Sequence, residues 1–335
     1  MLNGDLITGE NTFLENSTHY VDQIVRPMVD RGLTWASTYG NHDNDFNISA
    51  AAILSRENQW PNSRTTQMVS DPDTGVSNYY LPVYPADCDP SPSSSTSDPT
   101  RCPPALLLWF FDSRGGFRSQ QADPTTGKPI PLPNWVDSRV ADWFTRTNAD
   151  LVAAAGGTTI PSLAFVHIPT NASLALQEQG VNKHRQPGID DDAPLARQAQ
   201  GWCADGRAGC EYGGNDEPFM RAVASTPGLM ALFSGHDHGD TWCYRWEGLL
   251  PGMAVEGNGV DLCFGQRSGY GGYGRWIRGA RQVVVSLEGL GEFAVDTHIR
   301  LESGDVVGNV SLNGTYGWDW YPATKNEKTR LPAAE

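Results

Sequence analysis

The sequence predicts an α/β protein, on two observations. Apolar runs typical of strands alternate with segments of helical spacing through most of the 335-residue chain. Further strand-like runs then follow one another without a helical segment between them, which is typical of antiparallel β structure. No repeat of fixed period interrupts this order. We therefore expect one domain over residues 1–335, with βαβ units first and antiparallel strands last.

The first elements lead into polar residues. Residues 1–4 have the character of the end of a strand that delivers Asp5 into a loop. Residues 19–30 place apolar side chains at helical spacing, and residues 33–39 form a strand-like run that ends at Gly40. A glycine at this point lets the chain turn sharply and approach an ion.

The middle of the chain repeats the pattern after a low-complexity segment. Residues 86–104 are rich in Pro, Ser, Asp and Thr, which indicates a surface insertion. Residues 105–111 form a continuous apolar run, typical of a strand buried on both faces. An amphipathic helix is predicted over 134–148, with strands over 162–166 and 229–233.

The last elements are predicted to be strands at 241–246, 282–287 and 293–301, with a glycine-rich stretch at 265–274 between them. Open α/β sheets bind their ligands beyond the carboxyl ends of the strands. Polar residues that follow the predicted strands are therefore the candidates for a binding site.

Five such residues offer ligand atoms that suit metal ions: Asp5, Asn41, His167, His236 and His238. A carboxylate such as Asp5 can bridge two cations, and neutral imidazoles suit zinc, iron and manganese. Alone, Asp5 would more often be a turn residue and His167 a core histidine. Two histidines at i and i+2 on one turn have few structural uses, however. In their joint order and spacing the five residues predict a binuclear metal centre.

A centre of this kind lowers the pKa of a bound water to about 7 and orients the resulting metal-bound hydroxide for in-line attack on a phosphate. The leaving alkoxide then needs a proton donor. His42 lies next to a predicted ligand and is the natural candidate.

The composition limits the partners. A formal net charge of −15 argues against nucleic acid or an anionic membrane as the main partner. The chain has no apolar run of the roughly 18 residues that a membrane span needs, and no signal peptide begins it.

Several features favour a secreted protein or one of the secretory pathway or vacuole. Five N-glycosylation sequons are present, and the six cysteines are even in number. Six free thiols in a cytosolic protein are the alternative. Proximity in the sequence suggests three disulfides, Cys88–Cys102, Cys203–Cys210 and Cys243–Cys263, although six cysteines permit about 15 connectivities.

The motifs together resemble the calcineurin-like metallophosphoesterases, the superfamily that includes the purple acid phosphatases. The fungal and plant branch is matched by three segments, Gly40-Asn41-His42-Asp43, Phe165-Val166-His167-Ile168-Pro169 and Gly235-His236-Asp237-His238. The stretch 262–274 also looks like that branch. The resemblance implies two packed mixed β-sheets flanked by helices, with the metals at one edge of the sandwich.

The resemblance also implies roles for the candidate residues. Asp5 would bridge two metal ions, while Asn41, His167 and His236 would complete one metal site. His238 would belong to the other site.

For the leaving group, the resemblance implies that His42 acts as the proton donor, with Asp43 orienting it. Thr8 stands where purple acid phosphatases have a tyrosine ligand, so no purple colour is expected.

The chain departs from the family pattern at its start. In the family, a D-x-H element supplies two metal ligands, and no residue before Asp5 matches it. We expect an N-terminally truncated chain. The alternative is a genuine chain with an impaired metal centre.

The sequence thus favours an enzyme that hydrolyses phosphate monoesters, of small molecules or of phosphoproteins, with two ions of iron, zinc or manganese. Two alternatives stay open. One is a catalytically silent metal-binding or interaction protein that has lost one metal, and the other is a phosphodiesterase of the same superfamily. The physiological substrate and the oligomeric state are left open.

Overall fold

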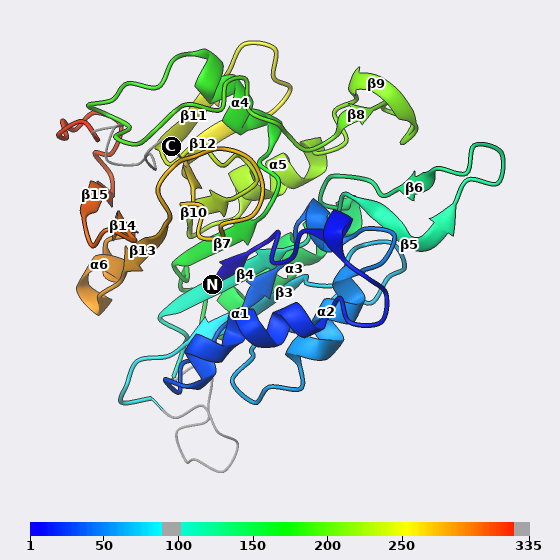
Figure 1. Ribbon diagram of the computed structural model, residues 1–335. Coiled ribbons are helices and arrows are strands. Elements are labelled where there is room, and N and C mark those ends of the chain that lie inside the picture. The colour runs from blue at the N-terminus through cyan, green and yellow to red at the C-terminus, as the bar shows by residue number, and fades with distance from the viewer. Residues whose placement is uncertain (89–101, 325–335) are drawn as a thin grey trace.

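The computed structural model describes residues 1–88 and 102–324 and contains the predicted mixture of helices and strands (Figure 1). Its largest unit is a six-stranded sheet with the strand order β11-β12-β10-β7-β4-β3. The central strands β12, β10, β7 and β4 are parallel, and the edge strands β11 and β3 are antiparallel to their neighbours. The bounds are β3 (Tyr79–Val83), β4 (Leu106–Phe111), β7 (Ser162–Val166), β10 (Leu229–Ser234), β11 (Cys243–Leu249) and β12 (Glu256–Phe264).

The remaining strands form smaller sheets. An antiparallel sheet contains β13 (Gly279–Val284), β14 (Val295–Leu301) and β15 (Val306–Leu312). A short parallel pair joins β1 (Leu2–Asn3) to β2 (Ser37–Thr38). Two antiparallel hairpins complete the set, β5 (Phe117–Ala122) with β6 (Pro129–Pro131), and β8 (Gln200–Trp202) with β9 (Ala208–Tyr212).

The helices are short or of medium length. They are α1 (His19–Val29), α2 (Ala50–Glu57), α3 (Ser138–Ala154), α4 (Asn171–Glu178), α5 (Glu217–Ser225) and α6 (Leu287–Gly291), with the 3₁₀ turns η1 (Gly9–Asn11) and η2 (Asn41–Asp43).

Strand β4 shows how the large sheet separates two cores. Successive side chains of a strand point to opposite faces. Trp109 and Phe111 pack in the cluster that also holds Phe144 of α3 and Phe219 of α5. Phe110, between them in sequence, packs in a different cluster. Helices α3 and α5 therefore cover one face of the sheet.

The second cluster lies on the opposite face and contains residues of the three-stranded sheet, including Val295 and Val310. A row of stacked aromatic rings crosses four adjacent strands on this face. The ring centroids of Tyr79, Phe110, Phe165 and Phe233 are successively 4.5, 5.2 and 5.5 Å apart. The large sheet thus lies between helices and a second β layer.

The predicted fold class is confirmed, with two differences in detail. The large sheet is mixed and flanked by helices, as expected. The second β layer is a three-stranded antiparallel sheet with the separate β1–β2 pair, and not one continuous mixed sheet. The helix predicted over 134–148 begins at Ser138, because Asp137 caps it by accepting a hydrogen bond from the Arg139 backbone N–H.

The three predicted disulfides are all formed. Most of the predicted insertion at 86–104 lies outside the described residues, although Cys88 and Cys102 are joined across it. Among the helices of residues 1–88 and 102–324, none is long and apolar enough to cross a bilayer.

Candidate metal centre

The candidate ligands follow the carboxyl ends of four strands. Strand β1 ends before Gly4 and Asp5, and its parallel partner β2 leads to Asn41. Strands β7 and β10 pair in parallel, with Phe233 opposite Phe165, so the residues that follow them, His167 and His236, emerge side by side. Parallel pairing therefore explains how residues far apart in the sequence converge.

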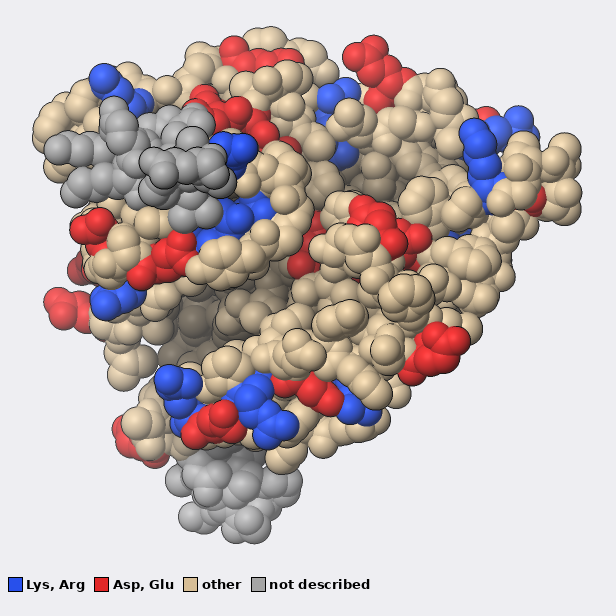
Figure 2. Space-filling view, in the orientation of Figure 1, with Lys and Arg blue, Asp and Glu red and all other residues tan. Residues whose placement is uncertain are grey.

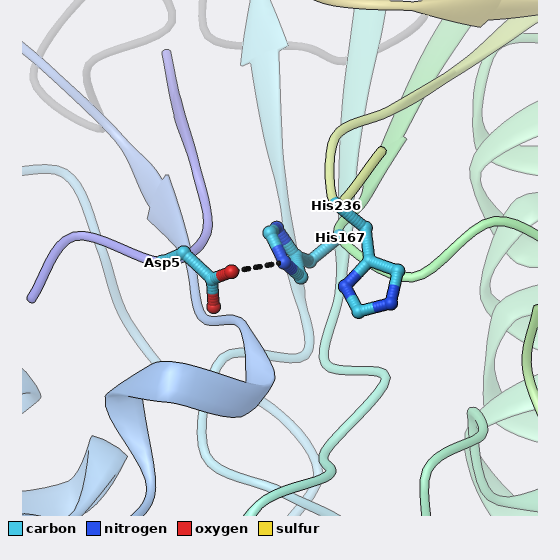
Figure 3. A group of neighbouring side chains, drawn as sticks. All are labelled: Asp5, His167 and His236. Atoms are coloured by element: carbon cyan, nitrogen blue, oxygen red, sulfur yellow. Dashed lines mark ion pairs between the residues drawn. The ribbon is translucent and has the colours of Figure 1, made fainter. Parts of the chain in front are cut away.

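Three of the predicted residues form a compact group. Ligand atoms of Asp5, His167 and His236 all lie within 4.8 Å of one another (Figure 3). Nε2 of His167 is 2.9 Å from Oδ2 of Asp5, and the His167 and His236 rings are 5.3 Å apart at 84°. Although Nε2 is this close to Oδ2, it has no hydrogen-bond partner of proper geometry within the described part of the chain.

His167 is held in one tautomer. Its Nδ1 lies 2.8 Å from the backbone carbonyl oxygen of Asn3. A carbonyl can only accept, so Nδ1 carries a proton and Nε2 is the nitrogen that faces Asp5. This is the arrangement that a metal-ligating histidine requires.

The charges of the group favour a cation. Burial alone would lower the pKa of His167, but the Asp5 carboxylate outweighs it and raises the pKa to about 9. Burial would raise the pKa of Asp5, and His167 and His42 instead hold it below its usual range. Burial and the neighbouring His167 lower the pKa of His236 to about 3, which leaves its imidazole neutral. A proton on His167 and a metal ion beside Asp5 would compete for the same place.

The side-chain oxygen of Asn41 also indicates a metal site. Its Oδ1 is buried and has no hydrogen-bond partner among the residues that the structure describes. A buried amide oxygen without a partner is unfavourable by about 1–3 kcal/mol unless something else satisfies it. His167, whose Nε2 faces the Asp5 carboxylate 2.9 Å away, lies at the same edge of the sheet. The donor set of one carboxylate, one amide oxygen and imidazoles fits zinc, iron or manganese.

Two glycines permit the close approach of these ligands. A Cβ on Gly4, whose φ is +86°, would lie 2.2 Å from Nδ1 of His167. A Cβ on Gly40 would lie 2.2 Å from Oδ1 of Asp5. Both positions exclude any side chain because the ligands occupy that space.

His42 lies beside the group with an acidic partner. Its backbone N–H donates to Oδ1 of Asp5 over 2.9 Å, and its Nδ1 is 2.8 Å from Oε1 of Glu10. The ring is 42% exposed, so Nε2 is available to a bound molecule.

Asp43 is fully buried and faces the backbone. Its carboxylate accepts hydrogen bonds from the N–H groups of Ile7 and Gly40, at 3.0 and 2.9 Å. Burial, and then the charge of Asp5, raise its pKa to about 7. Asp43 fixes the loop around Asp5, and the acidic partner of the His42 ring is Glu10 instead.

His238 stands outside the compact group of the described residues. Its ring stacks on Tyr273 with centroids 4.1 Å apart, and its Nδ1 lies 3.0 Å from the Tyr273 carbonyl oxygen. Nδ1 is therefore protonated and Nε2 free to bind a metal. Burial lowers the pKa of His238 and favours the neutral ring.

A cleft of ≈ 400 Å³ opens beside the group and is lined on one side by Asn41 and His236. Arg197 and Trp202 line it as well. Neither residue was found from the sequence, since both lie in a segment without a clear period. Glu10 was missed as well, because a carboxylate on a loop has no distinctive pattern.

This chain is similar to several known proteins. No family model matches it. Probable inactive purple acid phosphatase 29 of Arabidopsis thaliana is 23% identical over 301 residues, which are 84% of this chain and 64% of that protein. Probable inactive purple acid phosphatase 28 of the same plant is 26% identical over 300 residues, 84% of this chain and 63% of that protein. The chain therefore spans less than two thirds of the length of these relatives.

Among solved structures, a dimetal phosphatase from Danio rerio is similar with a TM-score of 0.49 and 10% identity, over 93% of this chain and 82% of that one. The sequence relatives are plant proteins of the purple acid phosphatase type, so the predicted superfamily and branch are confirmed.

Proposed function

We propose that this protein is a metal-dependent phosphoesterase that hydrolyses phosphate monoesters. One observation carries the proposal. Asp5, His167 and His236 converge from three separate strand ends, and the Oδ1 atom of Asn41 is buried without a hydrogen-bond partner among the described residues. Such a donor set is costly to bury unless a cation satisfies it.

The roles proposed here are those that the family resemblance implies. Asn41, His167 and His236 would hold one metal ion with Asp5, and Asp5 would share a second ion with His238. Bound there, ions of iron, zinc or manganese would supply positive charge that stabilises the charge developing on a phosphoryl group.

The proton for the leaving oxygen would come from Nε2 of His42. Glu10 holds the other nitrogen of this ring at 2.8 Å, which orients Nε2 away from the loop. The backbone N–H of His42 also fixes Asp5, so one residue ties the proton donor to the metal ligand.

A catalytically silent metal-binding protein is the second candidate. Within residues 1–88 and 102–324, the ligands we assign to the second ion are only Asp5 and His238, and His238 lies outside the compact group. A catalytic zinc site usually has about three protein ligands, one more than these two. The plant relatives also carry the word inactive in their names.

A direct experiment separates these candidates. The purified chain is loaded with manganese or zinc, its metal content is measured, and hydrolysis of 4-nitrophenyl phosphate is compared with that of bis(4-nitrophenyl) phosphate. The proposal expects bound metal and preferential turnover of the monoester, both lost in His167→Ala. His19→Ala, at an exposed position on α1, is the matched control. Bound metal without turnover would establish the silent protein, and preferential turnover of the diester would establish the diesterase.

We also propose that the protein is a glycoprotein of the secretory pathway. The three disulfides support an oxidising compartment. Of the sequon asparagines, Asn16 and Asn309 are exposed. Glycans should therefore be found at these two positions when the chain is expressed in a eukaryotic secretory host, which mass spectrometry of peptides checks.

A further inference from the structure

We propose that the cleft beside the metal centre is a leaving-group subsite for a planar, apolar group that carries a second anion. Trp202 would contact the planar group, and the guanidinium of Arg197 would bind the anion. This inference rests on the proposed function, since it names the class of ester that the same site accepts.

The position and volume of the cleft limit the kind of leaving group that it can hold. It lies between the β5–β6 and β8–β9 hairpins, where Figure 2 shows the surface hollowed, and it has a volume of ≈ 400 Å³. Asn41 and His236 are among its lining residues, so an ester whose phosphoryl group lies at the proposed metal centre would extend its leaving group into this space. The volume suits a group of one or two rings.

The lining is apolar apart from a few polar groups. Phe117, Leu132 and Ile168 contribute apolar surface, together with Trp202. No aspartate or glutamate lines the cleft, although the chain has 39 acidic and 24 basic residues. In so acidic a protein, a lining without carboxylates favours an anionic ligand.

Trp202 is held rigidly in place. Its ring meets that of Trp135 edge to face, with centroids 5.3 Å apart. The guanidinium of Arg114 lies 5.3 Å from the Trp135 ring centroid and donates to the Trp135 carbonyl oxygen at 2.9 and 2.7 Å. The disulfide Cys203–Cys210 closes the hairpin directly after Trp202. A pre-positioned aromatic wall binds a flat group with little loss of conformational entropy.

Arg197 presents its guanidinium against an aromatic ring. Its guanidinium lies 4.6 Å from the centroid of the Tyr212 ring, and the Tyr212 hydroxyl donates to Asp216 over 2.6 Å. The Nε atom of Arg197 is buried and has no hydrogen-bond partner within the part of the chain that the structure describes. No ion pair of Arg197 is found among those residues either. A guanidinium binds carboxylate or phosphate through two parallel hydrogen bonds, so a second anion on the ligand would satisfy these donors.

Calorimetry with inert analogues tests the proposal. The probes are 4-carboxybenzylphosphonate and benzylphosphonate, which differ only in the carboxylate, and the protein is the full chain loaded with manganese. We expect the carboxylated probe to bind about tenfold more tightly. Arg197→Gln should remove this preference, and Trp202→Ala should weaken both probes. Arg207→Gln is the matched control, because Arg207 lies next to the same hairpin but its side chain is 85% exposed.

The outcomes distinguish this inference from the proposed function. Equal affinity for the two probes, or a preference that survives Arg197→Gln, would overturn the subsite. Selective binding without any hydrolysis of the matching aryl phosphate would keep the subsite and refute the enzyme.

Arg197→Lys keeps the charge without the paired donors and serves if Arg197→Gln fails to fold. If no metal binds, 4-hydroxybenzoate replaces the phosphonates, and binding independent of Arg197 would again overturn the inference.

Discussion

His167 lies at the proposed metal centre with its Nδ1 atom already bound to a backbone carbonyl oxygen. The carbonyl of Asn3 holds Nδ1, while the Asn3 side chain donates to the carbonyl oxygens of Val166 and Phe233 at the ends of β7 and β10. One residue of β1 therefore sets the tautomer of a candidate ligand and ties together the two strands that deliver the histidines. At the scale of single residues, the centre depends on backbone groups as much as on side chains.

Gly40→Ala tests the close approach of the backbone to Asp5. The new Cβ would lie 2.2 Å from Oδ1 of Asp5 and must displace the carboxylate or the loop. We expect metal affinity to fall at least about tenfold and stability to fall by about 1–3 kcal/mol. Metal titration and urea unfolding measure both. Gly314→Ala, where a Cβ would meet nothing within 4 Å, is the control and should change neither quantity.

Glu10→Gln tests the partner of His42. Proton donation matters most when the leaving group is a poor one, so an alkyl phosphate should suffer more than 4-nitrophenyl phosphate. General acids contribute roughly 10²–10⁴-fold in rate, and loss of the orienting carboxylate should remove about tenfold of kcat for the alkyl ester. Bound metal should stay unchanged. Glu15→Gln, at an exposed position, is the control. An equal effect on both esters would refute this role for Glu10.

At the scale of elements, the start of α5 is linked to two other segments. Asp216 immediately precedes α5 and accepts hydrogen bonds from the Asn171 backbone at the start of α4 and from the Tyr212 hydroxyl on β9. Burial raises the pKa of this carboxyl group to about 6 from an ordinary 3.8. The link between the three elements is therefore sensitive to pH.

Asp216→Asn should flatten the pH dependence of stability. Because the folded pKa lies above the unfolded one, the contribution of Asp216 is fully present below a pH of about 4 and is lost as the pH rises through about 6. The loss is on the order of 3 kcal/mol in the wild type and should vanish in the variant. Urea unfolding at acidic and neutral pH measures it. Asp150→Asn, exposed on α3, should retain the wild-type dependence, and an Asp216→Asn variant that behaves like it would contradict the prediction.

At the scale of the whole molecule, the residues of the proposed metal centre come from two parts of the fold. Asp5 and Asn41 follow the β1–β2 pair, whereas His167 and His236 follow the six-stranded sheet. The two parts have largely different apolar clusters, one around Val21, Val25 and Ile53 and the others on the faces of the large sheet. A metal ion would join them.

Metal removal should therefore loosen the amino-terminal part first. A ligand present at about 100 times its dissociation constant stabilises the folded state by about 2.7 kcal/mol. We expect a chelator to lower the unfolding midpoint and to raise amide exchange in α1 and α2 more than in β7 and β10. His167→Ala should show no response to the chelator. A uniform rise in exchange over both parts would contradict the two-part description.

The strands of the large sheet could be predicted from the sequence better than the short helices and the contacts between loops. The buried strands β4, β7 and β10 could be predicted because each is a continuous apolar run with polar residues at its end. Helices α2 and α4 were not, since their short segments carry too few turns for a helical period to be recognised. The contacts of Glu10 and Arg197 depend on how distant loops meet, and no local pattern encodes such a meeting.

The cleft that contains Arg197 has no acidic lining residue although the protein as a whole is acidic, and this contrast should affect the rate at which an anionic ligand associates. At low ionic strength the net charge of −15 repels an approaching anionic ester at long range, before Arg197 can attract it at short range. Added salt shortens the screening length from about 30 Å at 0.01 M to about 8 Å at 0.15 M, so it weakens the distant repulsion more than the local attraction. The association rate constant of 4-carboxybenzylphosphonate should therefore rise as salt is added over this range. Stopped-flow measurements would detect the rise, and a fall would mean that positive charge at the site dominates the field even far from the surface.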